Sequence, residues 1–234
     1  MKYTKKSKYI TVGLLVVSIV CSYLLFISRE PQKLTVTESP VNNIDEIVLV
    51  PISGRQEEII ETLQFNLKQT FPNTKITVDQ SIVTLPKEIF NPKRQQYDAA
   101  DILEEIDRLF SDQRSTQMVI AVIDDNIYSE NLNFVFSSID IENNIGVVST
   151  YYLQKEVPIS SDTVNRLEFA LEVTDKRVYK TTLRMVGGMV GLESGISRGS
   201  ECVMNFSSTL IELDKKGLAW CDDETSILKT AGLF

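Results

Sequence analysis

The chain has no histidine, and the candidate metal-binding side chains that its sequence offers are cysteines and carboxylates. Without an imidazole, a Ser/His/Asp or Cys/His nucleophile mechanism is excluded, and so is a zinc site that needs histidine ligands. Cysteines stand at Cys21, Cys202 and Cys221, and the acidic run Asp222–Glu224 follows the last of them. This run could bind calcium through oxygen atoms, but it lacks EF-hand spacing, and a solvated acidic turn is the simpler interpretation.

The composition is that of a folded acidic protein. Of its 234 residues, 43% are hydrophobic and 24% are charged, which excludes a wholly disordered chain. Residues 31–234 carry 19 basic and 31 acidic side chains, so this part is more acidic than the net charge of −8 for the whole chain indicates. A surface of that kind repels phosphate backbones, and we therefore predict no nucleic-acid partner.

The elements that must position these side chains follow from the spacing of apolar residues. Short apolar runs predict strands, and apolar residues at helical spacing predict helices. The expected strands are Glu46–Val50, Lys75–Val78, Met118–Ile123, Asn133–Phe136 and Ile145–Ser149, and the expected helices are Gln56–Phe71, Tyr97–Phe110 and Asp162–Val190. Alternation of strands and helices, with a closing strand pair, predicts one α/β domain with a mixed sheet.

The N-terminal region predicts a membrane anchor. Residues 9–28 contain no charge and would form a helix roughly 30 Å long, which is the thickness of a bilayer core. Four lysines precede this segment, so residues 1–8 are expected in the cytoplasm, residues 29–44 form a linker, and residues 45–234 form a domain outside the cytoplasm. A cleaved signal peptide is the alternative, but the apolar run is long for one and Ser28–Glu30 offers no small-residue cleavage pattern. Cys21 is interpreted as an apolar residue within the membrane.

Many short segments in a fixed order resemble the archaemetzincins, a family of zinc metallopeptidases. The segments are Pro92–Ala99, Asp125–Tyr128, Leu132–Phe136, Gly146–Ser149, Arg177–Lys180, Leu183–Gly195, Cys202–Ser207, Asp214–Lys216 and Trp220–Cys221. So many matches in one order are more specific than any single motif. The resemblance covers roughly residues 45–224 and implies a metzincin-like (zincin-like) α/β domain with an active-site-type helix.

The resemblance also implies that the zinc-binding motif HExxHxxGxxH has been lost. The three histidines fall at Arg184, Gly188 and Ser194, the general-base glutamate falls at Met185, and the helix-ending glycine is present as Gly191. Two imidazoles one helical turn apart hold the metal, and the glutamate polarises the zinc-bound water. We therefore expect no catalytic residues, no bound metal and no cofactor.

The family's second zinc site, which uses four cysteines, is represented here by Cys202 and Cys221 alone. In an oxidising compartment these two are expected to form a disulfide that contributes about 3 kcal/mol in the chain-entropy model. Two buried free thiols are the alternative. Met204 falls at the methionine of the turn beneath the family's metal, where core packing is the simpler role.

Peptide binding could persist without zinc-dependent catalysis, because a peptide that adds a strand to a sheet needs only free backbone groups and shallow pockets. The candidate edge strands are Phe134, Val135 and Phe136, and Val147, Val148 and Ser149. We therefore expect a pseudopeptidase that binds a polypeptide or membrane-protein partner, with a charge at Val135 or Val148 as the test. One alternative is a hydrolase whose site was rebuilt from carboxylates such as Glu193, Asp222 and Glu224, and another is a structural component of an envelope complex that works through its acidic face.

Overall fold

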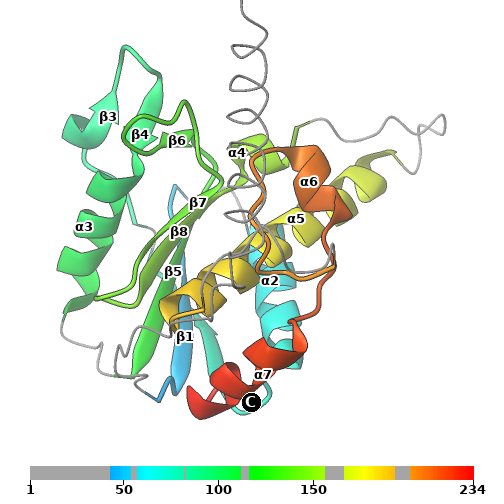
Figure 1. The fold of residues 1–234 in the computed structure, drawn as a ribbon. Coiled ribbons are helices and arrows are strands. Elements are labelled where there is room, and N and C mark those ends of the chain that lie inside the picture. The colour runs from blue at the N-terminus through cyan, green and yellow to red at the C-terminus, as the bar shows by residue number, and fades with distance from the viewer. Residues whose placement is uncertain (1–42, 54–56, 82, 112–115, 156–165, 193–200) are drawn as a thin grey trace, which may run out of the picture. The chain divides into compact units, whose positions relative to one another are not determined.

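The computed structural model describes residues 43–53, 57–81, 83–111, 116–155, 166–192 and 201–234. Helices and strands alternate along the chain, as Figure 1 shows. The elements are β1 (Glu46–Pro51), α2 (Glu57–Thr70), β2 (Lys75–Val78), the 3-10 helix η1 (Lys87–Ile89), β3 (Phe90–Asn91), β4 (Gln96–Asp98), α3 (Ala99–Phe110), β5 (Gln117–Ile123), β6 (Ile127–Tyr128), β7 (Ser137–Asp140), β8 (Ile145–Ser149), α4 (Thr150–Leu153), α5 (Arg166–Met189), α6 (Leu210–Lys215) and α7 (Asp222–Thr230).

The main sheet has the strand order β2-β1-β5-β8-β7. Its first four strands are parallel to one another, and β7 pairs antiparallel with β8. The predicted α/β domain with a mixed sheet is therefore confirmed. A second, small sheet joins β3, β4 and β6 beside the N-terminal end of α3.

Helices cover both faces of the main sheet because its strands alternate two sets of apolar side chains. In β1, Ile47 and Leu49 pack with α2 and α5, whereas Val48 and Val50 pack with α3. Each face thus buries its own core cluster, which gives three layers in the order helix, sheet, helix (Figure 1).

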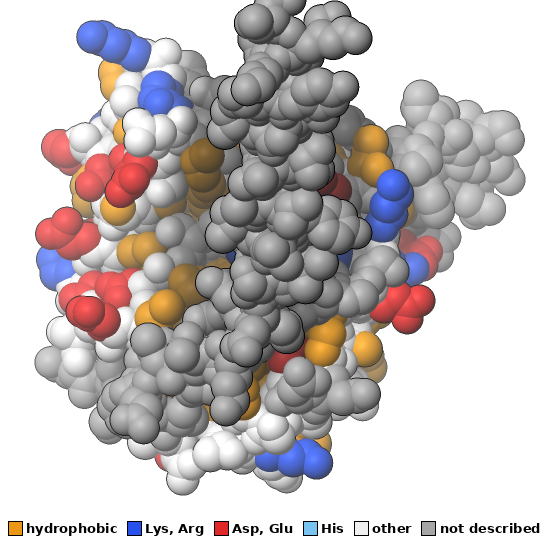
Figure 2. All heavy atoms as spheres, viewed as in Figure 1, with side chains coloured by type: hydrophobic (Ala, Val, Ile, Leu, Met, Phe, Trp, Pro, Cys, Tyr) orange, Lys and Arg blue, Asp and Glu red, His pale blue; other side chains and the backbone are white. Residues whose placement is uncertain are grey.

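The outer face of α3 is acidic. The helix has the sequence AADILEEIDRLF, in which Ile102, Leu103, Ile106 and Phe110 are buried against the sheet, whereas Asp101 and Glu104 are exposed. Figure 2 shows acidic side chains gathered over this side of the molecule. The arrangement agrees with the acidic composition, and it supplies the surface on which the envelope-component alternative depends.

One expected strand is displaced along the chain. Asn133–Phe136 is an irregular segment, and the strand begins just after it, as β7 at Ser137. The apolar run Phe134–Phe136 has the composition of a strand, but its side chains are half-buried in a groove and do not lie within a sheet. The first two residues of the expected helix Tyr97–Phe110 belong to β4, and Asp98 caps α3 by accepting a hydrogen bond from the backbone N–H of Ala100.

Residues 9–28, for which a membrane helix is predicted, lie outside the described residues. In the described part of the chain, no helix is long and apolar enough to cross a membrane.

Candidate functional site

A groove of about 420 Å³ lies between α5 and the segments that precede β7 and α6. Its walls are mostly apolar and aromatic, and its charged side chains are cationic. The lining residues are Leu132, Asn133, Phe134, Val135, Phe136, Ser137, Thr181, Arg184, Phe206, Ser207, Ser208, Leu213 and Lys216. The groove therefore brings Arg184 and Phe134–Phe136, which the sequence singled out, to one place.

The helix α5 supplies one side of the groove through Thr181 and Arg184. The helix ends where the sequence predicts, because Gly191 has a φ of +88° and the N–H of Leu192 donates to the carbonyl of Gly187 at 2.8 Å. The guanidinium carbon of Arg184 lies 5.3 Å from the centre of the Phe206 ring, which is a cation–π contact across the groove. Burial lowers the pKa of Arg184 from its ordinary value.

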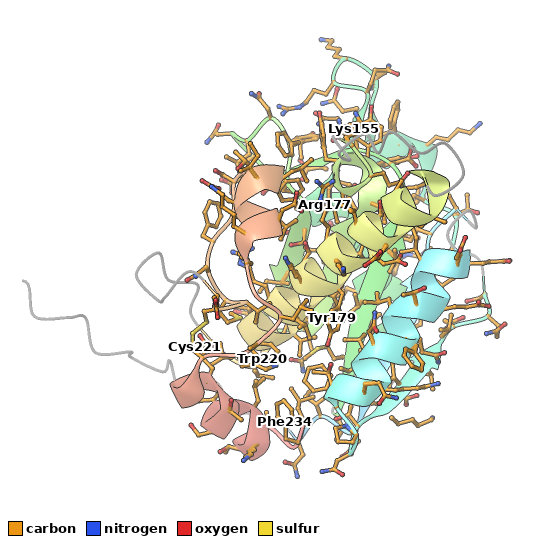
Figure 3. The ribbon with its side chains drawn as sticks, turned by 90° about the vertical axis from the view of Figure 1, so that its right-hand side faces the viewer. Lys155, Arg177, Tyr179, Trp220, Cys221 and Phe234 are labelled. Carbon is orange, nitrogen blue, oxygen red and sulfur yellow. A yellow bond between two sulfur atoms is a disulfide. The ribbon has the colours of Figure 1, made fainter. Side chains whose placement is uncertain are left out.

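The helix α6 supplies the opposite side and is held on α5 by buried cations. Arg177 donates to both carboxylate oxygens of Asp214, at 2.8 and 2.7 Å, and to the carbonyls of Leu153 and Lys155 (Figure 3). Lys180 donates to the carbonyls of Leu213 and Asp214 in the last turn of α6, at 3.2 and 3.0 Å. These bonds fix Leu213 at the groove wall.

Lys216 follows α6 directly and is 6% exposed. Its ammonium donates to the carbonyl of Val203 at 3.2 Å. Burial and, after it, the charges of Arg184 and Lys180 lower the pKa of Lys216 to about 8, while Glu212 opposes this shift. An anion in the groove would therefore meet two cations whose charges are poorly solvated.

The other side of the entrance is the segment Phe134–Phe136. Phe134 contacts Phe136 and Tyr152, with ring centres 5.5 and 4.2 Å apart, and the carbonyl of Phe136 accepts a hydrogen bond from the N–H of Ser149 at 2.9 Å. Just beyond, β7 is the edge strand of the main sheet. Phe134–Phe136 thus lines the groove beside an edge strand, without being a strand itself.

The prediction that Val147, Val148 and Ser149 form a sheet edge is wrong. They belong to β8, which pairs with β5 on one side and β7 on the other. Val147 and Val148 are fully buried because both faces of this inner strand are covered. A charge at Val148 would consequently test folding and not binding.

Met185, Gly188 and Met204, which also match family positions, do not line the groove. Met185 is 2% exposed and packs against Gly146 of β8. A Cβ atom placed on Gly188 would lie 2.7 Å from Cδ1 of Ile139 in β7, so an imidazole there would require Ile139 to move. Met204 is fully buried and packs against Gly187 of α5. Ser194 and Glu193 lie outside the described residues.

Cys202 and Cys221 are joined by a disulfide, with their Cα atoms 5.4 Å apart, as the sequence predicted (Figure 3). Glu224 approaches both residues: its Oε2 lies 3.2 Å from Sγ of Cys202 and accepts a hydrogen bond from the N–H of Cys221 at 2.9 Å. In the reduced state, these three side chains could offer a metal two thiolates and one carboxylate within 4.8 Å of one another. Glu224 is 1% exposed and does not line the groove, so it cannot rebuild a carboxylate site there.

The sequence singled out Arg184 at a motif position, but it did not assign the other cations of the groove, Arg177, Lys180 and Lys216, to the site. Arg177, Lys180 and Arg184 recur at a spacing of three and four residues, which places them on one face of a helix. That basic stripe was a usable signal. Lys216 and Phe206 lie in the family-like segments Asp214–Lys216 and Cys202–Ser207, but the sequence does not show that they reach the groove, because this depends on how the chain after α5 returns to it.

The chain is similar in sequence and in fold to known proteins. The model of peptidase family M54 matches residues 45–230. The archaemetzincin of Saccharolobus solfataricus is 30% identical over 177 residues, which cover 75% of this chain and 88% of the relative. Among solved structures, the archaemetzincin of Methanopyrus kandleri (25% identity, TM-score 0.63, 82% of this chain and 97% of that one) and a zinc-dependent peptidase of Methanocorpusculum labreanum (20% identity, TM-score 0.65, 78% and 99%) have similar folds.

The fold and these matches define the class first: the domain is related to zinc metallopeptidases. More narrowly, the chain belongs to the archaemetzincin family, peptidase family M54. The resemblance drawn from the sequence is thereby confirmed.

Proposed function

We propose that this archaemetzincin domain binds a polypeptide in its groove without hydrolysing it. Two facts together carry the proposal. The domain has a groove beside α5, and none of the described motif positions on α5 has a side chain that binds zinc. The volume of the groove, about 420 Å³, is within the range of ligand pockets, about 300–1,000 Å³.

The residues present do not fit the metal that the family name implies. The chain has no histidine, and a cation, Arg184, lines the groove at the position of the first histidine. Met185 cannot accept a proton and is directed into the core, and Gly188 has no side chain. Zinc-dependent activation of water by this motif is therefore not part of the proposed function.

The groove suits a polypeptide because it adjoins the edge strand β7. An edge strand can accept a further strand through its free backbone groups, and neighbouring pockets then receive alternate side chains. Phe134, Phe136 and Phe206 give such side chains an aromatic surface. Phe206 is 54% exposed, so its ring is accessible to a partner.

We further propose that residues 9–28 anchor the domain in a membrane and that the domain lies outside the cytoplasm. The uncharged 20-residue run and the four lysines before it support this placement. A disulfide between Cys202 and Cys221 is compatible with an oxidising compartment.

The test is selection of a displayed random-peptide library on the full chain in detergent. Enriched peptides are then synthesised and titrated against the wild type, the variant Phe206→Asp and the control Phe65→Asp. Phe65 is 62% exposed on α2 and does not line the groove, so it matches Phe206 in residue type and exposure.

We expect Phe206→Asp to weaken binding at least about tenfold, because it places a charge on an apolar contact surface, and Phe65→Asp to leave binding unchanged. The same peptides should remain intact when incubated with the protein and equimolar zinc. Cleavage of a peptide would contradict the non-catalytic part of the proposal, and equal binding by both variants would contradict the use of the groove.

A further inference from the structure

The groove is a cationic pocket in an acidic protein. Two basic residues line it: Arg184, which belongs to α5, and Lys216, which directly follows α6. No acidic residue of the described chain lines it. Lys180 lies behind them with its ammonium on the last carbonyls of α6. A local positive site within a chain of net charge −8 indicates complementarity to an anion.

Lys216 is a buried cation in the wall of the groove. In the described part of the chain no carboxylate lies within ion-pair distance of it, and its ammonium donates a hydrogen bond to a neutral carbonyl, that of Val203. Glu212 is the acidic group that acts on it, and this carboxylate already accepts hydrogen bonds from Ser208 and Thr209. A bound anion would supply a compensating charge that the described residues do not.

The apolar walls restrict which anion fits. Phe134, Phe136, Phe206 and Leu213 surround the cationic end, so a free inorganic ion would leave most of the groove unfilled. A carboxylate attached to an apolar side chain matches both parts. Because the ammonium of Lys216 is bonded to the carbonyl of Val203, a fully buried residue, a chain passing beyond the cations would collide with the core.

We propose that the groove binds the C-terminal carboxylate of a polypeptide between Arg184 and Lys216, with an apolar last side chain against the aromatic walls. The inference rests on the proposed function and specifies its ligand. A chain terminus ends where the pocket is closed, whereas the side chain of an internal aspartate or glutamate requires the backbone to continue in both directions.

The experiment titrates the full chain in detergent micelles with three N-acetylated pentapeptides. The first ends in phenylalanine with a free carboxylate, the second is the same peptide with a C-terminal amide, and the third is an amide with aspartate as its last residue. Each is measured on the wild type, on Phe206→Asp, on Lys216→Met and on the control Lys215→Met, because Lys215 is an exposed neighbour of the same residue type.

We expect the free acid to bind the wild type at least about tenfold more tightly than either amide, as hydrogen bonds to charged groups require. Lys216→Met should remove that preference and Lys215→Met should keep it. Equal binding of the free acid and its amide overturns the inference. If Phe206→Asp still weakens the binding of these two peptides, the proposed function stands without the inference. If the aspartyl amide matches the free acid, side-chain recognition replaces recognition of a terminus. If no peptide binds, both proposals fail.

A second measurement covers the case in which Lys216→Met does not fold. The charged groups that face Lys216 are Arg184 and Lys180 from α5 and Glu212 from α6. The pKa of Lys216 is about 8, so the wild type's preference for the free acid should fall as the pH rises from about 8 towards about 10. A preference that stays constant over that range overturns the role of Lys216.

Discussion

Arg177 and Asp214 are 37 residues apart in the sequence and form a two-pronged ion pair, with Nε to Oδ1 at 2.8 Å and Nη2 to Oδ2 at 2.7 Å. The arginine side chain is 2% exposed, whereas the aspartate is 41% exposed. The pair joins α5 to α6, the two helices on either side of the groove. A buried arginine thus links the two helices that line the groove.

Asp214→Asn should lower the free energy of unfolding by about 1–3 kcal/mol, because it leaves a buried guanidinium without its counter-charge. Solvent around the half-exposed Asp214 keeps the effect below that of a fully buried pair. Urea denaturation followed by fluorescence measures it, since Trp220 is the single tryptophan of the chain. The exposed pair Glu172–Lys176 is the control: Glu172→Gln should cost no more than about 0.5 kcal/mol, and an equal loss would show that burial is irrelevant.

Two adjacent glycines of α5 should respond oppositely to alanine. A Cβ atom on Gly187 would lie 2.5 Å from Sδ of Met204 and 2.9 Å from the Trp220 ring, neither of which can easily retreat. Gly187→Ala should therefore destabilise the fold by about 1–3 kcal/mol. At Gly188 the contact is the end of the Ile139 side chain, which can rotate, so Gly188→Ala should be neutral or should stabilise the helix by up to about 1 kcal/mol. Thermal unfolding of both variants decides, and equal effects would contradict the packing beneath Gly187.

The stability of the fold should depend on the charge of Lys216. Its pKa is about 8 in the folded chain and 10.5 for a free lysine. The unfolded chain therefore binds more protons between these values, so the Lys216 contribution to the free energy of unfolding rises with pH across that window, on the order of 3 kcal/mol in total. Below about pH 8 both states are protonated and the contribution is absent. The difference between wild type and Lys216→Met, measured by urea denaturation at several pH values, isolates it, and a difference independent of pH would contradict the burial of the ammonium.

Metal binding should depend on the redox state. With the Cys202–Cys221 disulfide intact, native mass spectrometry after exposure to equimolar zinc should show the protein without metal, because sulfur in a disulfide is a poor ligand. After reduction, one zinc per chain is expected on the two thiolates and Glu224, and Cys221→Ser should abolish it. Zinc retained by the oxidised protein would place a site elsewhere and would reopen the question of peptidase activity.

The strands and helices of this domain could largely be predicted because the apolar periodicity of β1, α2, β5 and α3 is set by local spacing. The structure of the segment before β7 could not be predicted. Phe134–Phe136 has the composition of a strand, but it is irregular and lines the groove. Likewise β8 looked like an edge because the sequence does not reveal which strand pairs on its far side. The motif positions on α5 identified one wall of the site, whereas Lys216 and Phe206 are brought there by long-range packing.

The disulfide has a further consequence, because the loop that it closes contains the whole C-terminal wall of the groove, from Phe206 to Lys216. A protease that cuts the exposed stretch around Phe206 or Ile211 would produce two fragments that remain covalently joined. Such a nicked molecule would migrate as an intact chain until it is reduced. The wall would also stay where Arg177 and Lys180 hold it, so a single cut need not release a bound partner.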